Sequence, residues 1–123
     1  MKLRVKDNTL RFRLSQSEAK ELNSKGTIHC TTSFGSSTFG YGLHKSINSF
    51  EVIFENGMIT ISIPSDIIEN WAGSDQVGID KEIQFENGDL IYILIEKDFK
   101  CLTERPDEDE SDLYDNPHDK HTC

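Results

Sequence analysis

The sequence predicts a β-rich α+β protein with about eight antiparallel strands, arranged in hairpins that form a curled sheet or barrel, and two short helices. Three observations lead to this prediction. Apolar and polar residues alternate with a period of two along most of the chain, as in strands with one buried face. Turn sequences of two residues separate several of these runs. Two other segments begin with residues that typically start helices.

The first hairpin lies at the amino terminus. Residues 2–6 and 10–14 alternate charged and apolar side chains around a two-residue Asp7-Asn8 turn. A turn of this length places Arg4 opposite Arg11 and leaves the other face of the strand pair apolar. We therefore expect a hairpin with one basic face and one apolar face.

A short helix and two strands complete the first half of the chain. Residues 15–18, Ser-Gln-Ser-Glu, form a capping-box pattern, and the helix that they start is expected to end near Leu22, before Gly26. Alternation resumes over residues 27–33 and 38–44, which predicts two strands joined by a loop rich in Gly and Ser.

The second half begins with another hairpin and another helix. Residues 50–55 and 58–63 alternate around Asn56-Gly57, the strongest short sequence signal for a hairpin turn. Pro64 and Ser65 then start a helix that reaches Trp71 and ends at Gly73.

A third hairpin ends the β-rich part of the chain. It pairs residues 79–86 with residues 89–97 across Asn87-Gly88, and its second strand is apolar on both faces, which is typical of a central strand. The order of elements thus repeats, and we interpret the two halves as a hairpin-helix-hairpin duplication in pattern. A shift of 49 residues superposes apolar positions of the two halves: Phe12 on Ile61, Leu14 on Ile63 and Leu22 on Trp71.

Charge divides the chain into a domain and a tail. Residues 103–123 contain eight acidic side chains, two basic ones and few large apolar ones. Such a segment cannot bury enough apolar surface to offset the entropy lost on ordering. We expect a single β-rich domain over residues 1–102 and a disordered acidic tail over residues 103–123. Residues 1–13, by contrast, contain five basic side chains and one acidic side chain.

Composition excludes several classes of protein. No apolar run approaches the ~18–20 residues that cross a bilayer, and the amino terminus lacks the apolar stretch of a secretory signal. We therefore expect a soluble cytoplasmic protein with no membrane contact. The net charge of −9 argues against nucleic-acid binding, which needs clustered Lys and Arg.

No complete catalytic motif is present, and we assign no catalytic residue and no cofactor. The glycine spacing of residues 35–40 is that of a phosphate loop, but Tyr41 follows where Lys is needed. Cys30 follows His29 in a strand, which places the two side chains on opposite faces. One candidate metal cluster lies at the carboxyl end and has ligand types that suit Zn²⁺ or Ni²⁺: His118, His121 and Cys123. A solvated tail is the simpler interpretation of this cluster.

Basic side chains on the first hairpin are the candidate anion-binding residues: Lys2, Arg4, Lys6, Arg11 and Arg13. Like charges directly opposed across two strands destabilise by up to ~1 kcal/mol per pair, so this cluster requires an anionic neighbour. Three kinds of anionic neighbour remain as alternatives. The first is a set of carboxylates on adjacent strands, such as Glu51, Glu82 or Glu96. The second is the acidic tail. The third is an external polyanion, such as an oligophosphate, RNA or an acidic peptide.

Three segments resemble a family of small uncharacterised bacterial proteins that is typical of Bacteroidetes: MKLRVKDNTLRFRLSQSE (1–18), WAGSDQVG (71–78) and IEKDFKCL (95–102). This resemblance covers nearly the whole chain and implies no function. The hairpin-and-helix halves with a basic strand face are also similar to the triphosphate-tunnel (CYTH-like) fold. That fold is an eight-stranded barrel whose lumen holds Lys and Arg for triphosphate and carboxylates for metal. Of its Glu-x-Glu-x-Lys strand only a fragment is present, Glu96-Lys97.

Two functions follow from this pattern. The leading hypothesis is a non-catalytic binding or interaction domain, with a basic strand face that binds a small polyanion or a protein partner. The alternative is an oligophosphate-binding protein or metal-dependent phosphohydrolase of triphosphate-tunnel type. In that case Lys2, Arg4, Arg11 and Arg13 would bind phosphates, and Glu51, Glu82 or Glu96 would bind Mg²⁺.

Overall fold

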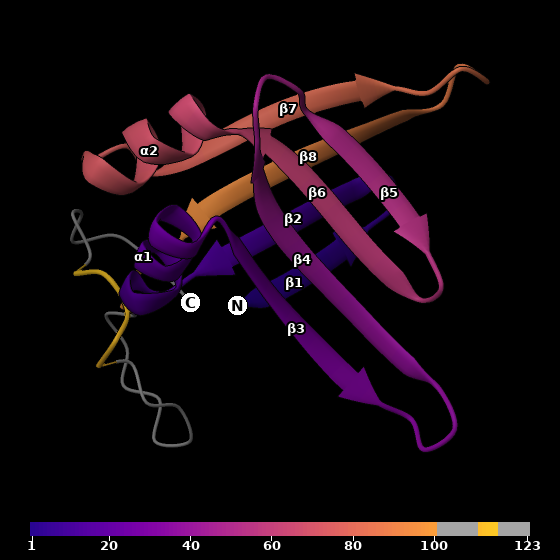
Figure 1. Ribbon diagram of the computed structural model, residues 1–123, viewed down its shortest axis with the longest axis horizontal. Helices are drawn as coiled ribbons and strands as arrows, with labels where there is room; N and C mark the ends of the chain where they lie inside the picture. The colour runs from indigo at the N-terminus through magenta and orange to yellow at the C-terminus, as the bar shows by residue number, and fades with distance from the viewer. Residues whose placement is uncertain (101–110, 116–123) are drawn as a thin grey trace.

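The computed structural model describes residues 1–100 and 111–115. These residues form eight strands and two helices (Figure 1). In chain order the elements are β1 (Lys2–Lys6), β2 (Thr9–Leu14), α1 (Gln16–Lys25), β3 (Thr27–Ser33), β4 (Thr38–Ser46), β5 (Glu51–Glu55), β6 (Met58–Pro64), α2 (Ser65–Gly73), β7 (Gly78–Gln84) and β8 (Leu90–Lys97). The predicted β-rich class, with eight strands and two short helices, is confirmed.

The strands form two separate mixed sheets. Sheet A has the order β1-β2-β8-β7, and sheet B has the order β3-β4-β6-β5. Strands within each hairpin are antiparallel, but β2 pairs with β8, and β4 with β6, in parallel. The strands of the two sheets cross each other in projection (Figure 1). The predictions of an all-antiparallel arrangement and of a barrel are therefore wrong. Turn sequences determine the pairing inside a hairpin but not which hairpin lies beside it.

The predicted repeat is visible in the fold. Exchanging the first half of the chain, β1-β2-α1-β3-β4, with the second, β5-β6-α2-β7-β8, converts the strand order of sheet A into that of sheet B. Each sheet therefore takes its first hairpin from one half and its second hairpin from the other half. The two halves are interlocked, so neither could form its sheet alone.

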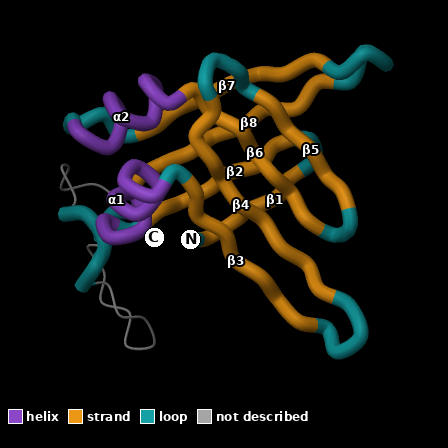
Figure 2. The backbone as a smooth tube through the Cα atoms, in the orientation of Figure 1, coloured by secondary structure: helices purple, strands orange, loops and turns teal. Residues whose placement is uncertain are grey.

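The core lies between the sheets and repeats with the same symmetry. In each sheet one row of four apolar side chains crosses all four strands: Leu3-Phe12-Ile95-Ile79 in sheet A and Val52-Ile61-Leu43-Ile28 in sheet B. The two helices lie together on one side of the molecule (Figure 2). There they bury Leu22 from α1 and Trp71 from α2. All six positions that the shift of 49 residues superposes are fully buried.

The turns follow the sequence signals with one exception. Asn56 and Gly57 have φ angles of 52° and 75°, the left-handed pair that a two-residue turn of type I′ requires. Asp7 also adopts a positive φ, 50°. In the third hairpin only Gly88 is left-handed, and Gln84 pairs with Leu90. The Asn87-Gly88 connection is therefore longer than the two residues expected, which shifts the strand register by one residue.

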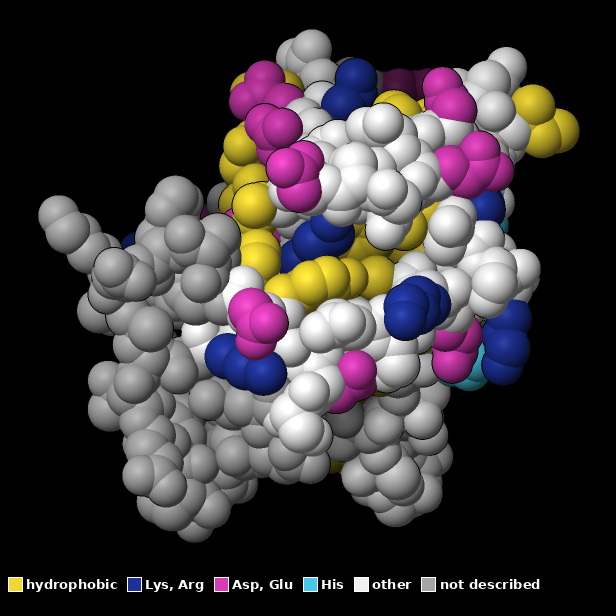
Figure 3. Space-filling view, turned by 90° about the vertical axis from the view of Figure 1, so that its left-hand side faces the viewer, with side chains coloured by type: hydrophobic (Ala, Val, Ile, Leu, Met, Phe, Trp, Pro, Cys, Tyr) yellow, Lys and Arg dark blue, Asp and Glu magenta, His cyan; other side chains and the backbone are white. Residues whose placement is uncertain are grey.

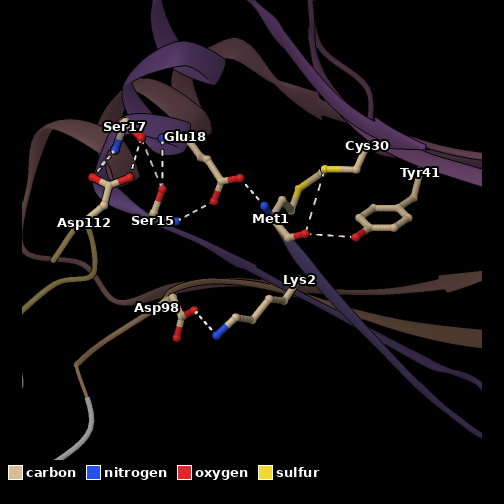
Figure 4. Close-up of polar contacts among 9 residues, drawn as sticks. All are labelled: Met1, Lys2, Ser15, Ser17, Glu18, Cys30, Tyr41, Asp98 and Asp112. Carbon is tan, nitrogen blue, oxygen red and sulfur yellow. Dashed lines mark hydrogen bonds and ion pairs between the residues drawn. The ribbon is translucent and has the colours of Figure 1, made fainter. Parts of the chain in front are cut away.

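Helix α1 begins at the predicted capping box. The Ser15 hydroxyl accepts a hydrogen bond from the Glu18 amide, and the Glu18 carboxylate accepts one from the Ser15 amide (Figure 4). The helix continues to Lys25, three residues beyond the predicted end, because Gly26 is the first residue in the left-handed conformation that terminates it.

The Glu18 carboxylate also forms an ion pair with the amino group of Met1 (Figure 4). Burial raises the pKa of Glu18, but the hydrogen bond and charge of this amine, with the bonds to Ser15, outweigh burial and lower the pKa below its ordinary value. A carboxyl group with a lowered folded-state pKa stabilises the fold above its unfolded-state pKa. This stabilisation is lost as the pH falls through the folded-state value.

We expect Glu18→Gln to lower the free energy of unfolding at neutral pH by about 0.5–1 kcal/mol, the size of a charge effect at a helix amino terminus. The difference from the wild type should shrink as the pH falls below ~4.3, the ordinary pKa of Glu. Urea unfolding at a series of pH values measures this difference. Glu21→Gln, an exposed change on the same helix, is the control. An equal loss in both variants, or a difference that persists at acid pH, would contradict the assignment.

Part of the predicted tail contacts the domain. Asp112 accepts hydrogen bonds from the amide and hydroxyl of Ser17 at the start of α1 (Figure 4). Leu113 is buried, and the Tyr114 ring packs on Phe99. The rest of the tail lies outside the described residues. None of the described helices is long and apolar enough to cross a membrane.

Candidate functional site

The five candidate anion-binding residues lie together on the outer face of sheet A. The register of the first hairpin is the predicted one: Lys2 lies opposite Arg13, and Arg4 lies opposite Arg11. Lys6 lies opposite Thr9. The apolar face of the same hairpin points toward sheet B and contributes Leu10 and Phe12 to the core. The basic face therefore points away from the core.

Strands β8 and β7 extend the rows of paired side chains that cross this face, and two of these rows end in an acidic residue on β7. One row crosses the sheet from Arg4 through Arg11 and Leu94 to Asp80. The next row runs from Lys6 through Thr9 and Tyr92 to Glu82. The outer face of sheet A thus has a basic half on β1 and β2 and an acidic half on β8 and β7.

Two of the five bases are paired within the protein. Arg11 forms a close ion pair with Glu96 of β8, and the Lys2 ammonium lies 3.1 Å from an Asp98 carboxylate oxygen. The other three form no ion pair with the residues that the structure describes: Arg4, Lys6 and Arg13.

Of the three carboxylates considered as neighbours, only Glu96 contacts the basic cluster. Glu82 lies on β7, at the opposite edge of the same sheet. Glu51 lies on β5, in the other sheet. The sequence could not separate these three, because their positions depend on which hairpins pair with each other.

The basic half surrounds a hollow of about 360 Å³ that is lined by Arg4, Lys6, Asp7, Thr9, Arg11 and Leu94. Three cations therefore converge on one depression that is wide enough for a small anionic group. A guanidinium can bind a phosphate or carboxylate through two parallel hydrogen bonds, and an ammonium acts as a point charge. Asp7 at the turn adds one negative charge to this lining, and Arg11 already pairs with Glu96, so the unpaired positive charge of the hollow comes from Arg4 and Lys6.

The helical side of the molecule has a different surface. There acidic and basic side chains are intermingled (Figure 3). Asp112, from the described part of the acidic tail, binds the start of α1 and not the basic half of sheet A. The described part of the tail therefore does not occupy the hollow.

The candidate metal residues His118, His121 and Cys123 lie outside the described residues. Within residues 1–100 and 111–115, no group of three or more His, Cys, Asp or Glu side chains is arranged to hold a metal ion.

The structure brings together one pair that sequence analysis missed. The Ser62 hydroxyl lies 3.0 Å from Nε2 of His44 on the neighbouring strand, as in a nucleophile–base pair. Ser62 is only 7% exposed, so a substrate could not reach its hydroxyl. The two residues are 18 positions apart in the chain, and no motif connects them. We interpret this contact as a cross-strand hydrogen bond of sheet B.

A second missed feature is the buried Lys97. Its ammonium donates a 2.6 Å hydrogen bond to the Ser74 carbonyl at the end of α2 and lies over the rings of Trp71 and Tyr114. Burial lowers the pKa of this ammonium group. Lys97 thereby connects α2 to the described part of the tail, which is a structural role.

The fold defines a small β-rich protein with two four-stranded mixed sheets, one of which has an outer face with a basic half and an acidic half. The chain belongs to a family of unknown function, DUF7009, which matches residues 1–118. This agrees with the expected membership of an uncharacterised family. No curated protein and no solved structure matches the chain significantly.

Proposed function

We propose that the protein is a non-catalytic binding module whose basic half of sheet A binds a polyanionic group. One observation carries this proposal. Arg4 and Lys6 converge with Arg11 on a hollow, and neither Arg4 nor Lys6 has an ionic partner among the described residues.

An anion in this hollow would relieve a local electrostatic cost. Arg4 and Arg11 are directly opposed across two antiparallel strands, an arrangement that destabilises by up to ~1 kcal/mol. A ligand that binds only the folded state stabilises that state by an amount that grows with the logarithm of the ligand concentration once this exceeds the Kd. The charge of the ligand should matter more than its shape, because two of the three basic side chains that line the hollow, Arg4 and Lys6, are exposed.

The alternative, a Mg²⁺-dependent phosphohydrolase, requires carboxylates beside the bound phosphates. Its three candidates are dispersed in the fold: Glu51 lies on sheet B, Glu82 lies on the far edge of sheet A, and Glu96 pairs with Arg11. This arrangement favours binding over hydrolysis.

Thermal unfolding with and without tripolyphosphate tests the proposal. We expect tripolyphosphate to raise the melting temperature. At a concentration a hundredfold above its Kd, it should add about 2.7 kcal/mol to the free energy of unfolding. Sulfate at equal ionic strength should give a smaller shift. Arg4→Ala with Lys6→Ala should abolish the specific shift. Lys20→Ala with Lys25→Ala, which removes two exposed lysines of α1, should retain it.

Two results would reject the proposal. One is a shift no larger than that with sulfate. The other is an equal loss in both double variants, which would indicate a nonspecific charge effect. Release of phosphate from tripolyphosphate that requires Mg²⁺ and is lost in Arg4→Ala with Lys6→Ala would instead support the phosphohydrolase.

A further inference from the structure

We infer that the anionic partner of the basic half is the acidic half of a second copy of this chain, so that two copies associate through the outer faces of their A sheets. This inference rests on the proposed function, because it uses the same basic residues. It goes further by naming the partner and by giving the acidic half of the face a role.

The charge pattern of the face is self-complementary. From β1 to β7, one row reads basic, basic, apolar, acidic, and the next reads basic, polar, aromatic, acidic. The outermost columns carry the exposed charges, Arg4 and Lys6 on β1 and Asp80 and Glu82 on β7. Neighbouring strands lie ~4.8 Å apart, so these two columns are separated by roughly 14 Å.

This pattern selects one symmetric way to pair two copies. In this pairing a two-fold axis lies in the interface, runs parallel to the strands and passes between β2 and β8. Strand β1 of one copy then faces β7 of the other copy, and each residue faces a residue of the same row. Arg4 then faces the second copy's Asp80, and Lys6 faces its Glu82. An axis perpendicular to the strands would place bases over bases and is excluded by charge.

The middle of the face suits the same arrangement. Arg11 and Glu96 already neutralise each other there. Beside them β8 presents an apolar strip on its outer face, formed by Leu90, Tyr92 and Leu94. Leu90 is 45% exposed. Apolar residues at the centre with charges at the rim are the usual composition of a protein interface.

The expected dimer is weak and sensitive to salt, because a face of four short strands is small for an interface and its charges lie at the exposed rim. Sedimentation of the full chain should show self-association that weakens at least tenfold as ionic strength rises from about 0.01 M to about 0.15 M, where the screening length falls from ~30 Å to ~8 Å. This measurement needs no substitution.

Charge exchange provides the decisive test. The acidic-face variant combines Arg4→Glu with Lys6→Glu, and the basic-face variant combines Asp80→Lys with Glu82→Lys. All four side chains are exposed, and melting curves check that each variant folds. We expect each variant alone to associate at least tenfold more weakly than the wild type, and their equimolar mixture to associate at least tenfold more strongly than either one.

The control combines Lys20→Glu with Lys25→Glu, which changes net charge as much as the acidic-face variant does but on α1. It should associate like the wild type. A wild type that remains monomeric at low salt, or a mixture that associates no more strongly than its components, would overturn the inference.

Failure of the dimer can be distinguished from failure of the binding function. The basic-face variant keeps Arg4, Lys6 and Arg11. If tripolyphosphate stabilises this variant while the mixture stays monomeric, the face binds polyanions but not a second copy. If tripolyphosphate stabilises neither this variant nor the wild type, the proposed function also fails.

Discussion

Replacing Phe12 by alanine is expected to lower the free energy of unfolding by about 3–5 kcal/mol, the cost of removing a large ring from a packed core. Phe12 is fully buried at the centre of sheet A, between Leu3 of β1 and Ile95 of β8. Its ring also contacts Tyr41 of sheet B, with ring centroids 6.2 Å apart and planes inclined at 54°. The cavity would therefore open at the contact between the two sheets.

Phe54→Ala is the matched control for this change. Phe54 is 65% exposed on the edge strand β5, so its loss should alter the free energy of unfolding by no more than about 0.5 kcal/mol. Urea unfolding of both variants provides the comparison. Equal losses would show that Phe12 does not lie in the core between the sheets.

The second large effect is expected at the turn between β5 and β6. Gly57 has a φ of 75°, and a Cβ atom at this position would lie 2.7 Å from the carbonyl oxygen of Thr38. That oxygen belongs to the backbone, and the Gly57 carbonyl itself accepts a 2.9 Å hydrogen bond from the Gly40 amide. Gly57→Ala should therefore cost about 2–4 kcal/mol, the sum of left-handed strain and a steric clash.

Gly88→Ala separates these two contributions. Gly88 has a similar φ of 93°, but a Cβ atom there would meet no other atom within 4 Å. Only the conformational cost of about 1–2 kcal/mol should remain. Thermal or urea unfolding of the two variants measures the difference. Equal losses would mean that the β5–β6 turn does not lie against β4.

The basic face shows how far local sequence information extends. The two-residue Asp7-Asn8 turn correctly predicted that Arg4 lies opposite Arg11 and that the apolar side chains share the other face. The same reasoning gave a two-residue turn at Asn87-Gly88, which is wrong. There Gly88 alone is left-handed, and the connection between the paired strands is longer.

The neighbours of the basic face depended on long-range pairing. Arg11 meets Glu96 because β2 lies beside β8, which is more than 80 residues away in sequence. Turn residues act on adjacent segments only, so no local pattern distinguished Glu96 from Glu51 or Glu82. For the same reason the acidic half of sheet A, with Asp80, was not identified from the sequence.

The sequence by itself determined the order of the strands and helices and the register and basic face of the first hairpin, because these depend on side-chain periodicity and on turn and cap chemistry within a few residues. Only the tertiary structure decided that two interlocked mixed sheets form in place of a barrel. The parallel contacts between β2 and β8, and between β4 and β6, join the two halves of the chain. These contacts depend on how whole apolar faces pack together. The sequence pattern is compatible with many strand orders, whereas packing in three dimensions selects one of them.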